Sequence, residues 1–187
     1  MKIIFLDIDG VLNVEVYLTA FWDICKRINL ARPQAASLRM DAMRDYYGNL
    51  FCPLACRRLA WITEITGAKI VISSTWRMNG LSEMQAMWKH REIAGEVIDV
   101  TPIHMNREGR SNLSFTERCE RGNEIKEWLS LHPEVESYVI FDDDNDMLPE
   151  QINNFIQTDE AYGITLKDAE RAIQILSVTH TGALAGN

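Results

Sequence analysis

The N-terminal stretch Met1–Asn13, MKIIFLDIDGVLN, decides how the rest of the chain is interpreted. Four apolar residues, Ile3–Leu6, run directly into two aspartates that are separated by one residue and followed by Gly10. A continuous apolar run is typical of a strand that is buried on both faces of a parallel sheet. Residues i and i+2 of an extended segment share a face, so Asp7 and Asp9 are expected to point to the same side. Two like charges at the end of a buried strand need a proton or a cation to offset their repulsion.

Four further apolar runs indicate the other strands of the sheet. They lie at Lys69–Ser73, Glu96–Val100, Tyr138–Phe141 and Phe155–Thr158. Segments with helical periodicity lie between these runs, and strands that alternate with helices predict an α/β domain with a mainly parallel sheet. A length of 187 residues with 47% hydrophobic residues suits one packed domain, and we expect a single domain over residues 1–187.

Three helices are predicted from apolar spacing and from start and stop residues. Pro53 marks the first residue of one helix and Gly67 its end. The apolar face of that helix is expected to hold Leu54, Leu59, Ile62 and Ile65. A second helix is expected to end before Pro133. Thr165, with an aspartate three residues later, predicts a weak variant of the capping box at the start of a third helix.

Residues 14–52 do not fit this alternation of strands and helices. The segment is rich in aromatic residues and arginines, and we interpret it as an insertion, a small helical cap, over one end of the sheet. Side chains that it offers to a substrate are Tyr17, Phe21, Trp22, Arg27 and Arg32. The last residues, 179–187, are small and polar and are expected to form a flexible tail.

Composition excludes several classes of protein. The formal net charge of −8 argues against strong binding to duplex nucleic acid, which requires a basic surface. No apolar run approaches the roughly 20 residues of a membrane span, and the N-terminal apolar patch is too short for a signal peptide. The four cysteines show no CxxC spacing, which is typical of free thiols in a reducing compartment. We therefore expect a cytoplasmic protein without a membrane anchor.

Polar residues follow each of the three strongest strands at the edge where open α/β sheets bind ligands. Asp7 and Asp9 follow the first strand, serines the second, and a run of acidic residues, 142–146, the third. An aspartate pair alone is often a turn or a helix cap, but three such signals at strand ends are hard to ascribe to chance. Hard oxygen ligands without nearby Cys or His favour Mg²⁺. The sequence therefore predicts a magnesium site at this edge.

The three motifs together resemble the haloacid dehalogenase (HAD) superfamily of Mg²⁺-dependent phosphatases and phosphotransferases. The match joins an apolar strand with DxDGVL, a second strand with SS, and a third with DDxxD, over residues 2 to about 176 apart from the insertion. The segments STWR, DVTP, RGNEIKEWL and FDDDND are also similar to the phosphatase domains of Swiss-army-knife RNA-repair proteins. The resemblance implies a Rossmann-like three-layer sandwich with a central parallel sheet.

The resemblance also implies roles for the aspartates. Asp7 would be the nucleophile that forms an aspartyl-phosphate, and Asp9 the acid and then the base. Mg²⁺ would be held by Asp7, by the backbone carbonyl of Asp9 and by an acid of the third motif. Asp142 is the leading candidate for that ligand, with Asp143 and Asp146 as close alternatives.

Phosphate contacts follow from the same resemblance. The amides after Asp7, freed by Gly10, would help to hold phosphate oxygens. A hydroxyl of the second motif would donate to the phosphate; counting along the strands places Ser74 level with Asp7, with Ser73 as the alternative. The cation of the family is expected at the start of the helix before the last acidic strand. Arg121 is the preferred candidate for this cation, ahead of Lys126 and then Arg118.

Trp76 and Arg77 directly follow the serine motif, and two interpretations are open for each. Arg77 can contact a phosphate, or it can pair with an acid of the aspartate cluster or lie on the surface. Trp76 can stack on a nucleic-acid base or pack in the core.

The motifs predict a phosphomonoesterase that acts on a phosphorylated small molecule or a nucleic-acid end, with a nucleotide or nucleic-acid terminal phosphate preferred. The alternatives are a small-metabolite phosphatase and a catalytically silent phosphate-binding or regulatory module on the same fold. A dehalogenase would need neither Asp9 nor the third acidic motif. A P-loop nucleotide binder is excluded because the chain has no GxxxxGK[ST] segment.

Overall fold

A five-stranded sheet forms the centre of the computed structural model, which describes residues 1–31, 43–104 and 120–178. Its strands, in the spatial order β5-β4-β1-β6-β7, are β5 (Val97–Val100), β4 (Lys69–Ile72), β1 (Lys2–Leu6), β6 (Ser137–Asp142) and β7 (Phe155–Gln157). Every neighbouring pair is parallel. The five strands lie where the apolar runs predicted them, to within one residue at each end.

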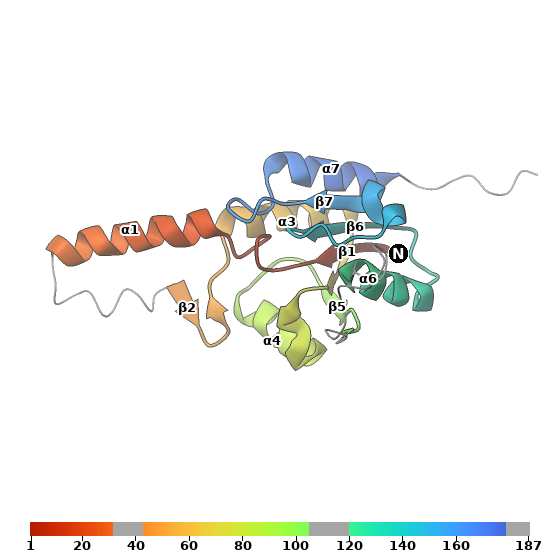
Figure 1. The fold of residues 1–187 in the computed structure, drawn as a ribbon, viewed down its shortest axis with the longest axis horizontal. Coiled ribbons are helices and arrows are strands. Elements are labelled where there is room, and N and C mark those ends of the chain that lie inside the picture. Colours follow the sequence, from red (N-terminus) through yellow and green to blue (C-terminus); the bar gives the residue numbers. More distant parts are fainter. Residues whose placement is uncertain (32–42, 105–119, 179–187) are drawn as a thin grey trace, which may run out of the picture.

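Helices cover both faces of this sheet and complete the predicted three-layer α/β fold (Figure 1). They are α1 (Glu15–Ala31), α3 (Pro53–Thr66), α4 (Leu81–His90), α6 (Glu120–Leu131) and α7 (Leu166–Ser177), with 3₁₀ turns η3 (Thr75–Asn79) and η5 (Pro149–Asn154). Strand side chains of one parity form a hydrophobic cluster with α3, α4 and α7, and those of the other parity pack on α6. This alternation is why the strands are apolar on both faces.

Both ends of α3 confirm the sequence signals, whereas its buried face differs from the prediction. Pro53 begins α3, and Gly67 ends it with a left-handed φ of 68°. The buried face of α3 consists of Ala55, Leu59 and Ile62. The prediction that Leu54 and Ile65 share this face is wrong, because they are 54% and 58% exposed. The buried residues are spaced by four and then three positions, so they form one narrow stripe along α3 that does not include Leu54 or Ile65.

The predicted capping box at the start of α7 is confirmed. The Thr165 hydroxyl accepts a hydrogen bond from the Asp168 amide at 3.3 Å. The Asp168 carboxylate in turn accepts one from the Thr165 amide at 2.9 Å. Two of the unpaired amides at the helix start are thereby satisfied.

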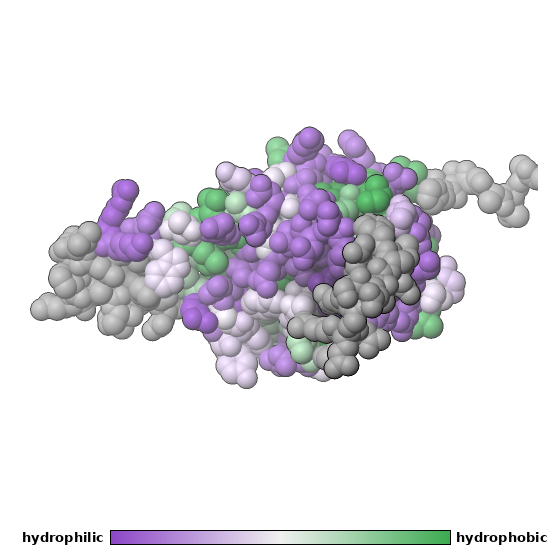
Figure 2. All heavy atoms as spheres, in the orientation of Figure 1, coloured by the Kyte–Doolittle hydropathy of each residue, from purple (hydrophilic) through white to green (hydrophobic). Residues whose placement is uncertain are grey.

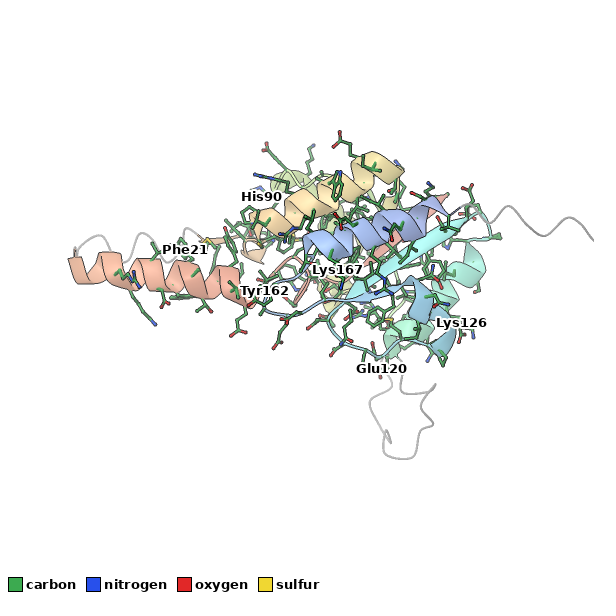
Figure 3. The ribbon with its side chains drawn as sticks, turned by 90° about the horizontal axis from the view of Figure 1, so that it is seen from above. Phe21, His90, Glu120, Lys126, Tyr162 and Lys167 are labelled. Carbon is green, nitrogen blue, oxygen red and sulfur yellow. The ribbon has the colours of Figure 1, made fainter. Side chains whose placement is uncertain are left out.

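The segment predicted as an insertion contains α1 and a short hairpin. Helix α1, which carries Phe21, projects from the sheet and its covering helices (Figures 1 and 3). Its first turn is fixed by hydrogen bonds from the amides of Glu15 and Val16 to the loop before α7. The hairpin pairs β2 (Arg44–Asp45) with β3 (Gly48–Asn49) in antiparallel fashion. Arg32 and the predicted tail at 179–187 lie outside the described residues.

On the face shown in Figure 2, hydrophilic residues form most of the surface of the sheet-and-helix domain, in keeping with the acidic composition.

Candidate active site

The carboxyl ends of β1, β4 and β6 lie side by side at one edge of the sheet. Leu6, the last residue of β1, pairs with the residues that precede Ser73 on β4 and Asp142 on β6. The amide of Asp7 donates to the carbonyl of Phe141 at 2.9 Å, which extends this pairing by one residue. The three motifs therefore meet at one edge, as the sequence predicts.

Three carboxylates gather at this edge. Asp7, Asp142 and Asp143 each offer an oxygen, and these atoms all lie within 4.8 Å of one another. Asp7 is 6% exposed and Asp142 is 2% exposed, so water solvates neither charge well. The Asp146 side chain, also predicted as a metal ligand, is not part of this group, and the predicted ligand atom of Asp9 is its backbone carbonyl.

Gly10 allows Asp143 to come this close. Its φ of +67° is a left-handed conformation that favours glycine, and a Cβ atom there would lie 2.4 Å from the Asp143 Cγ. Among the amides after Asp7 that are predicted to hold phosphate, that of Gly10 donates to the Asn13 carbonyl at 2.9 Å. Gly10 thus leaves space for the Asp143 side chain and helps to fix the turn through this hydrogen bond.

Burial changes the charge state of the cluster. It raises the pKa of Asp7 to about 6, although Arg121 and a hydrogen bond from Ser74 act in the opposite direction. Burial and the neighbouring Asp7 raise the pKa of Asp142 to about 8. The pKa of Asp143 is also raised, mainly by burial. Carboxylates in this state gain most from a bound cation, because a cation restores their ionised form.

The donor set fits a magnesium ion. Three carboxylates provide hard oxygen ligands, which Mg²⁺ prefers, and waters complete its coordination in most protein sites. Asp146 supplies a further oxygen nearby: its Oδ1 is buried and has no hydrogen-bond partner among the described residues. Such an orphaned acceptor suits a water bound to the ion.

Arg121 is the cation that reaches the acidic cluster. It lies in the first turn of α6, and its guanidinium is 3.1 Å from the Asp142 carboxylate and 3.5 Å from that of Asp7. Burial would lower the pKa of Arg121, but the carboxylates of Asp142 and Asp7 outweigh this effect and raise it. Lys126 instead extends to Glu150, at 2.9 Å, with its side chain 63% exposed. Arg118, the third candidate, lies outside the described residues.

The two serines differ from the expected register. The strand pairing places Ser73, rather than Ser74, level with Asp7, so the counting argument is wrong by one residue. Ser74 is nevertheless the serine whose side chain hydrogen-bonds Asp7, because the chain turns into η3 there. Ser74 also caps η3 by accepting from the Trp76 amide at 3.4 Å. The Ser73 hydroxyl is buried and has no partner among the described residues.

Arg77 is part of the scaffold that supports the site. It is 3% exposed, and its guanidinium donates to the carbonyls of Ser73, Ser74, Thr101 and Pro102. It also forms an ion pair with buried Glu124 at 2.5 Å. These contacts occupy the guanidinium and do not support the predicted direct contact with substrate. The alternative expectation is that Arg77 pairs with an acid of the aspartate cluster. Arg77 does pair with an acid, but this acid is Glu124, which lies outside that cluster.

Asp9 differs from its neighbours because it is exposed. Its Oδ1 accepts a hydrogen bond from the Asn13 amide group at 2.6 Å. Its Oδ2 accepts one from the indole of Trp76 at 2.8 Å. Trp76 therefore turns its polar edge to Asp9, while its partly buried ring packs against the hydrophobic core, in keeping with the core-packing alternative.

A cavity of ≈ 570 Å³ lies between the hairpin, the start of α3 and the end of α4. Its wall includes Arg44, Arg57 and Arg91, together with Phe51 and Tyr17. Phe51, which lines the cavity, lies with its ring centroid 5.7 Å from that of Trp76, so the Phe51 ring and the Trp76 indole link the cavity wall to Asp9.

Residues 3–169 match the family described as the HAD domain in Swiss Army Knife RNA repair proteins. The chain belongs to this family. Membership in this HAD family, together with the acidic edge, indicates a hydrolase of the phosphatase type. Comparisons with curated proteins and with solved structures found no match.

Two residues of this HAD site were missed by sequence reasoning. Glu124 lies three residues after Arg121 on α6 and approaches it to 3.6 Å, so the i,i+3 spacing of opposite charges was an available signal. Asn13 lies four residues after Asp9, and its contact depends on the turn at Gly10.

In the described parts of the chain, no helix is both long and apolar enough to cross a membrane.

Proposed function

We propose that the chain is a Mg²⁺-dependent phosphomonoester hydrolase that works through an aspartyl-phosphate on Asp7. One observation carries this proposal: a buried Asp7 carboxylate is adjacent to Arg121 and the acidic cluster, with an exposed carboxylate, Asp9, two residues away. Nucleophile, cation and acid are the groups that phosphoryl transfer through a covalent intermediate needs.

Asp7, Asp142 and Asp143 would hold the magnesium ion. The bound ion would offset the repulsion between the Asp7 carboxylate and the phosphate and stabilise charge on the phosphoryl oxygens. Arg121 and the Ser74 hydroxyl, both in contact with Asp7, would donate hydrogen bonds to those oxygens.

The first step forms a bond between an Asp7 oxygen and phosphorus. The bond from phosphorus to the leaving oxygen breaks, and Asp9 gives its proton to that oxygen, so the product leaves as a neutral alcohol. In the second step a water attacks phosphorus and loses a proton to the Asp9 carboxylate. The bond between phosphorus and Asp7 then breaks, which releases phosphate and regenerates both aspartates.

We further propose that the substrate carries its phosphate at the end of a nucleotide or a nucleic acid. The family description, which names RNA repair proteins, supports this choice. The cavity between the hairpin, α3 and α4 supports it too, because arginines and an aromatic ring are suited to the phosphates and bases of a short strand. The net charge of −8 favours a short substrate over a long duplex.

The segment 14–52 is proposed to act as a cap on a single HAD-like domain. Its hairpin and Tyr17 both contribute to the wall of the cavity, which supports a role in substrate selection. We also propose a cytoplasmic location, which the free thiols of Cys52 and Cys56 support.

Hydrolysis of p-nitrophenyl phosphate with Mg²⁺ tests the reaction class. We expect activity that is lost on chelation and in Asp7→Asn, whereas equal activity of that variant would refute the nucleophile. A parallel panel of nucleotides, 3′- and 5′-phosphorylated oligonucleotides and sugar phosphates tests the substrate. Preference for sugar phosphates would favour a small-metabolite phosphatase. Magnesium binding without turnover of any ester would indicate a silent phosphate-binding module.

A further inference from the structure

The contacts of Asp9 fix its carboxylate in one orientation. Each oxygen accepts one hydrogen bond, from Asn13 at 2.6 Å and from Trp76 at 2.8 Å. An exposed aspartate without such partners rotates freely about its side-chain bonds. With one donor on each oxygen, the remaining lone pairs point in defined directions.

Trp76 itself is held from several sides. Its ring packs against Phe51 with centroids 5.7 Å apart, and a Cβ atom on Gly48 would lie 3.7 Å from the edge of the ring. The Arg91 guanidinium lies 4.3 Å from the Phe51 ring centroid and makes two hydrogen bonds to Asp45 of the hairpin, at 2.7 and 2.8 Å. The hairpin thus fixes the indole that fixes Asp9.

The turn η3 also contacts the nucleophile, Asp7, through the residue that caps it. It carries Trp76, and the cap residue that begins it, Ser74, hydrogen-bonds Asp7. The position of the acid is thereby tied to the position of the nucleophile. A general acid must lie within hydrogen-bond reach of the leaving oxygen, so this coupling is useful to a two-step phosphoryl transfer.

We propose that Trp76 and Asn13 are positioning residues that hold Asp9 in line with the leaving oxygen of the substrate. This inference rests on the proposed function. It adds that the ordered hairpin of the insertion acts on the chemical step through Trp76. Neither residue contacts the phosphoryl group in this role, so their loss should affect proton delivery and leave phosphate binding unchanged.

The dependence on leaving group tests this role. The p-nitrophenolate ion leaves without a proton, whereas the alkoxide of a nucleoside 5′-phosphate needs one. In Trp76→Phe, we expect kcat/KM for the nucleoside phosphate to fall about tenfold more than that for p-nitrophenyl phosphate. This selective effect should appear in kcat/KM, which excludes the later hydrolysis of the intermediate that both esters share, and the inhibition constant of inorganic phosphate should be unchanged. Asn13→Ala should show the same selective loss and provides a second test if Trp76→Phe does not fold.

Trp128→Phe is the matched control. The Trp128 indole donates to Asp99 at 2.7 Å, which is the same kind of hydrogen bond away from the acidic cluster. Its removal should not distinguish the two leaving groups. Equal losses of kcat/KM for the two substrates in Trp76→Phe or Asn13→Ala, or weaker inhibition by phosphate, would overturn the positioning role. A wild-type chain inactive on both esters would instead refute the proposed function on which this role depends.

Discussion

Arg77 and Arg121 approach the same carboxylate, Glu124, yet their surroundings give them different roles. Arg77 donates to Glu124 and to backbone carbonyls, and burial lowers its pKa. Arg121 lies 3.6 Å from Glu124 but also contacts Asp7 and Asp142, which raise its pKa despite burial. One arginine stabilises the loops that carry the site, and the other places its charge among the reactive carboxylates. Adjacency to a motif in sequence does not distinguish these roles, whereas the set of partners does.

The largest effect on folding is expected for Arg77→Met. The substitution removes one partner of a buried ion pair and leaves Glu124 and several carbonyls unsatisfied, so the free energy of unfolding should fall by about 3–5 kcal/mol. Urea denaturation measures this change. Arg171→Met, at an exposed position on α7, is the control and should change stability by less than about 0.5 kcal/mol. Similar losses in the two variants would mean that Arg77 does not support the fold.

Arg121→Ala should lower activity strongly and change stability little, whereas Arg77→Met should lower stability. We expect kcat/KM for p-nitrophenyl phosphate to fall about 100-fold, because a charge beside the transferring phosphoryl group is lost. Stability should change by no more than about 1 kcal/mol, since Asp7 and Asp142, with raised pKa values, can remain protonated. Lys126→Ala, which removes an exposed cation from the same helix, should retain activity. Full activity in Arg121→Ala would remove this residue from the site.

The acidic cluster predicts an unusual pH dependence for the metal-free protein. The pKa values of Asp142, about 8, and Asp7, about 6, lie above the ordinary value of 3.8, so the folded state binds more protons than the unfolded state between these limits. Stability should therefore rise as pH falls from 8 to 6, by at most about 1.4 kcal/mol per pH unit for each titrating group.

Thermal unfolding in a chelator, compared with Asp142→Asn, isolates this contribution. The variant should lack most of the rise, and Mg²⁺ should flatten the wild-type profile by stabilising the ionised carboxylates. Parallel profiles for wild type and variant would show that Asp142 is not the titrating group.

The smallest expected effect concerns Arg57, for which the described residues provide no ion partner. Its side chain lines the cavity between the hairpin, α3 and α4, so Arg57→Ala should raise KM for a short 3′- or 5′-phosphorylated oligonucleotide by about threefold and leave p-nitrophenyl phosphate unaffected. Steady-state kinetics with both substrates measures the difference, with Arg171→Ala as the control. Equal changes for both substrates would contradict a strand-binding role for the cavity.

Local signals in the sequence were sufficient for the strands and for several helix ends. Apolar runs placed the strands, and Pro53, Gly67 and Thr165 marked helix boundaries because each acts through its own backbone or its nearest neighbours. Arg121 was selected by its place at a helix start, and the structure brings it to the acidic cluster. Interactions at this range depend on few other residues, so the sequence encodes them directly.

The site contacts that the sequence did not predict depend on segments that are distant in sequence. The partner of Arg77 is 47 residues away, and the partner of the Trp76 indole is 67 residues away. The helical or strand periodicity of a sequence does not indicate which distant residues form such pairs. The register error at Ser74 has a similar cause, because pairing between strands fixed the position of Ser73 while a turn fixed that of Ser74.

The central claim is that Asp7 is phosphorylated and Asp9 completes the cycle, and trapping the intermediate tests it most directly. Asp9→Asn mixed with p-nitrophenyl phosphate and Mg²⁺ should release about one nitrophenolate per chain in a rapid burst, because this leaving group needs no proton while hydrolysis of the intermediate needs a base. Intact mass and peptide mapping after an acid quench should then find one hydroxylamine-sensitive phosphoryl group on Asp7. A phosphoryl group on another residue, or steady turnover without a modified chain, would contradict the account.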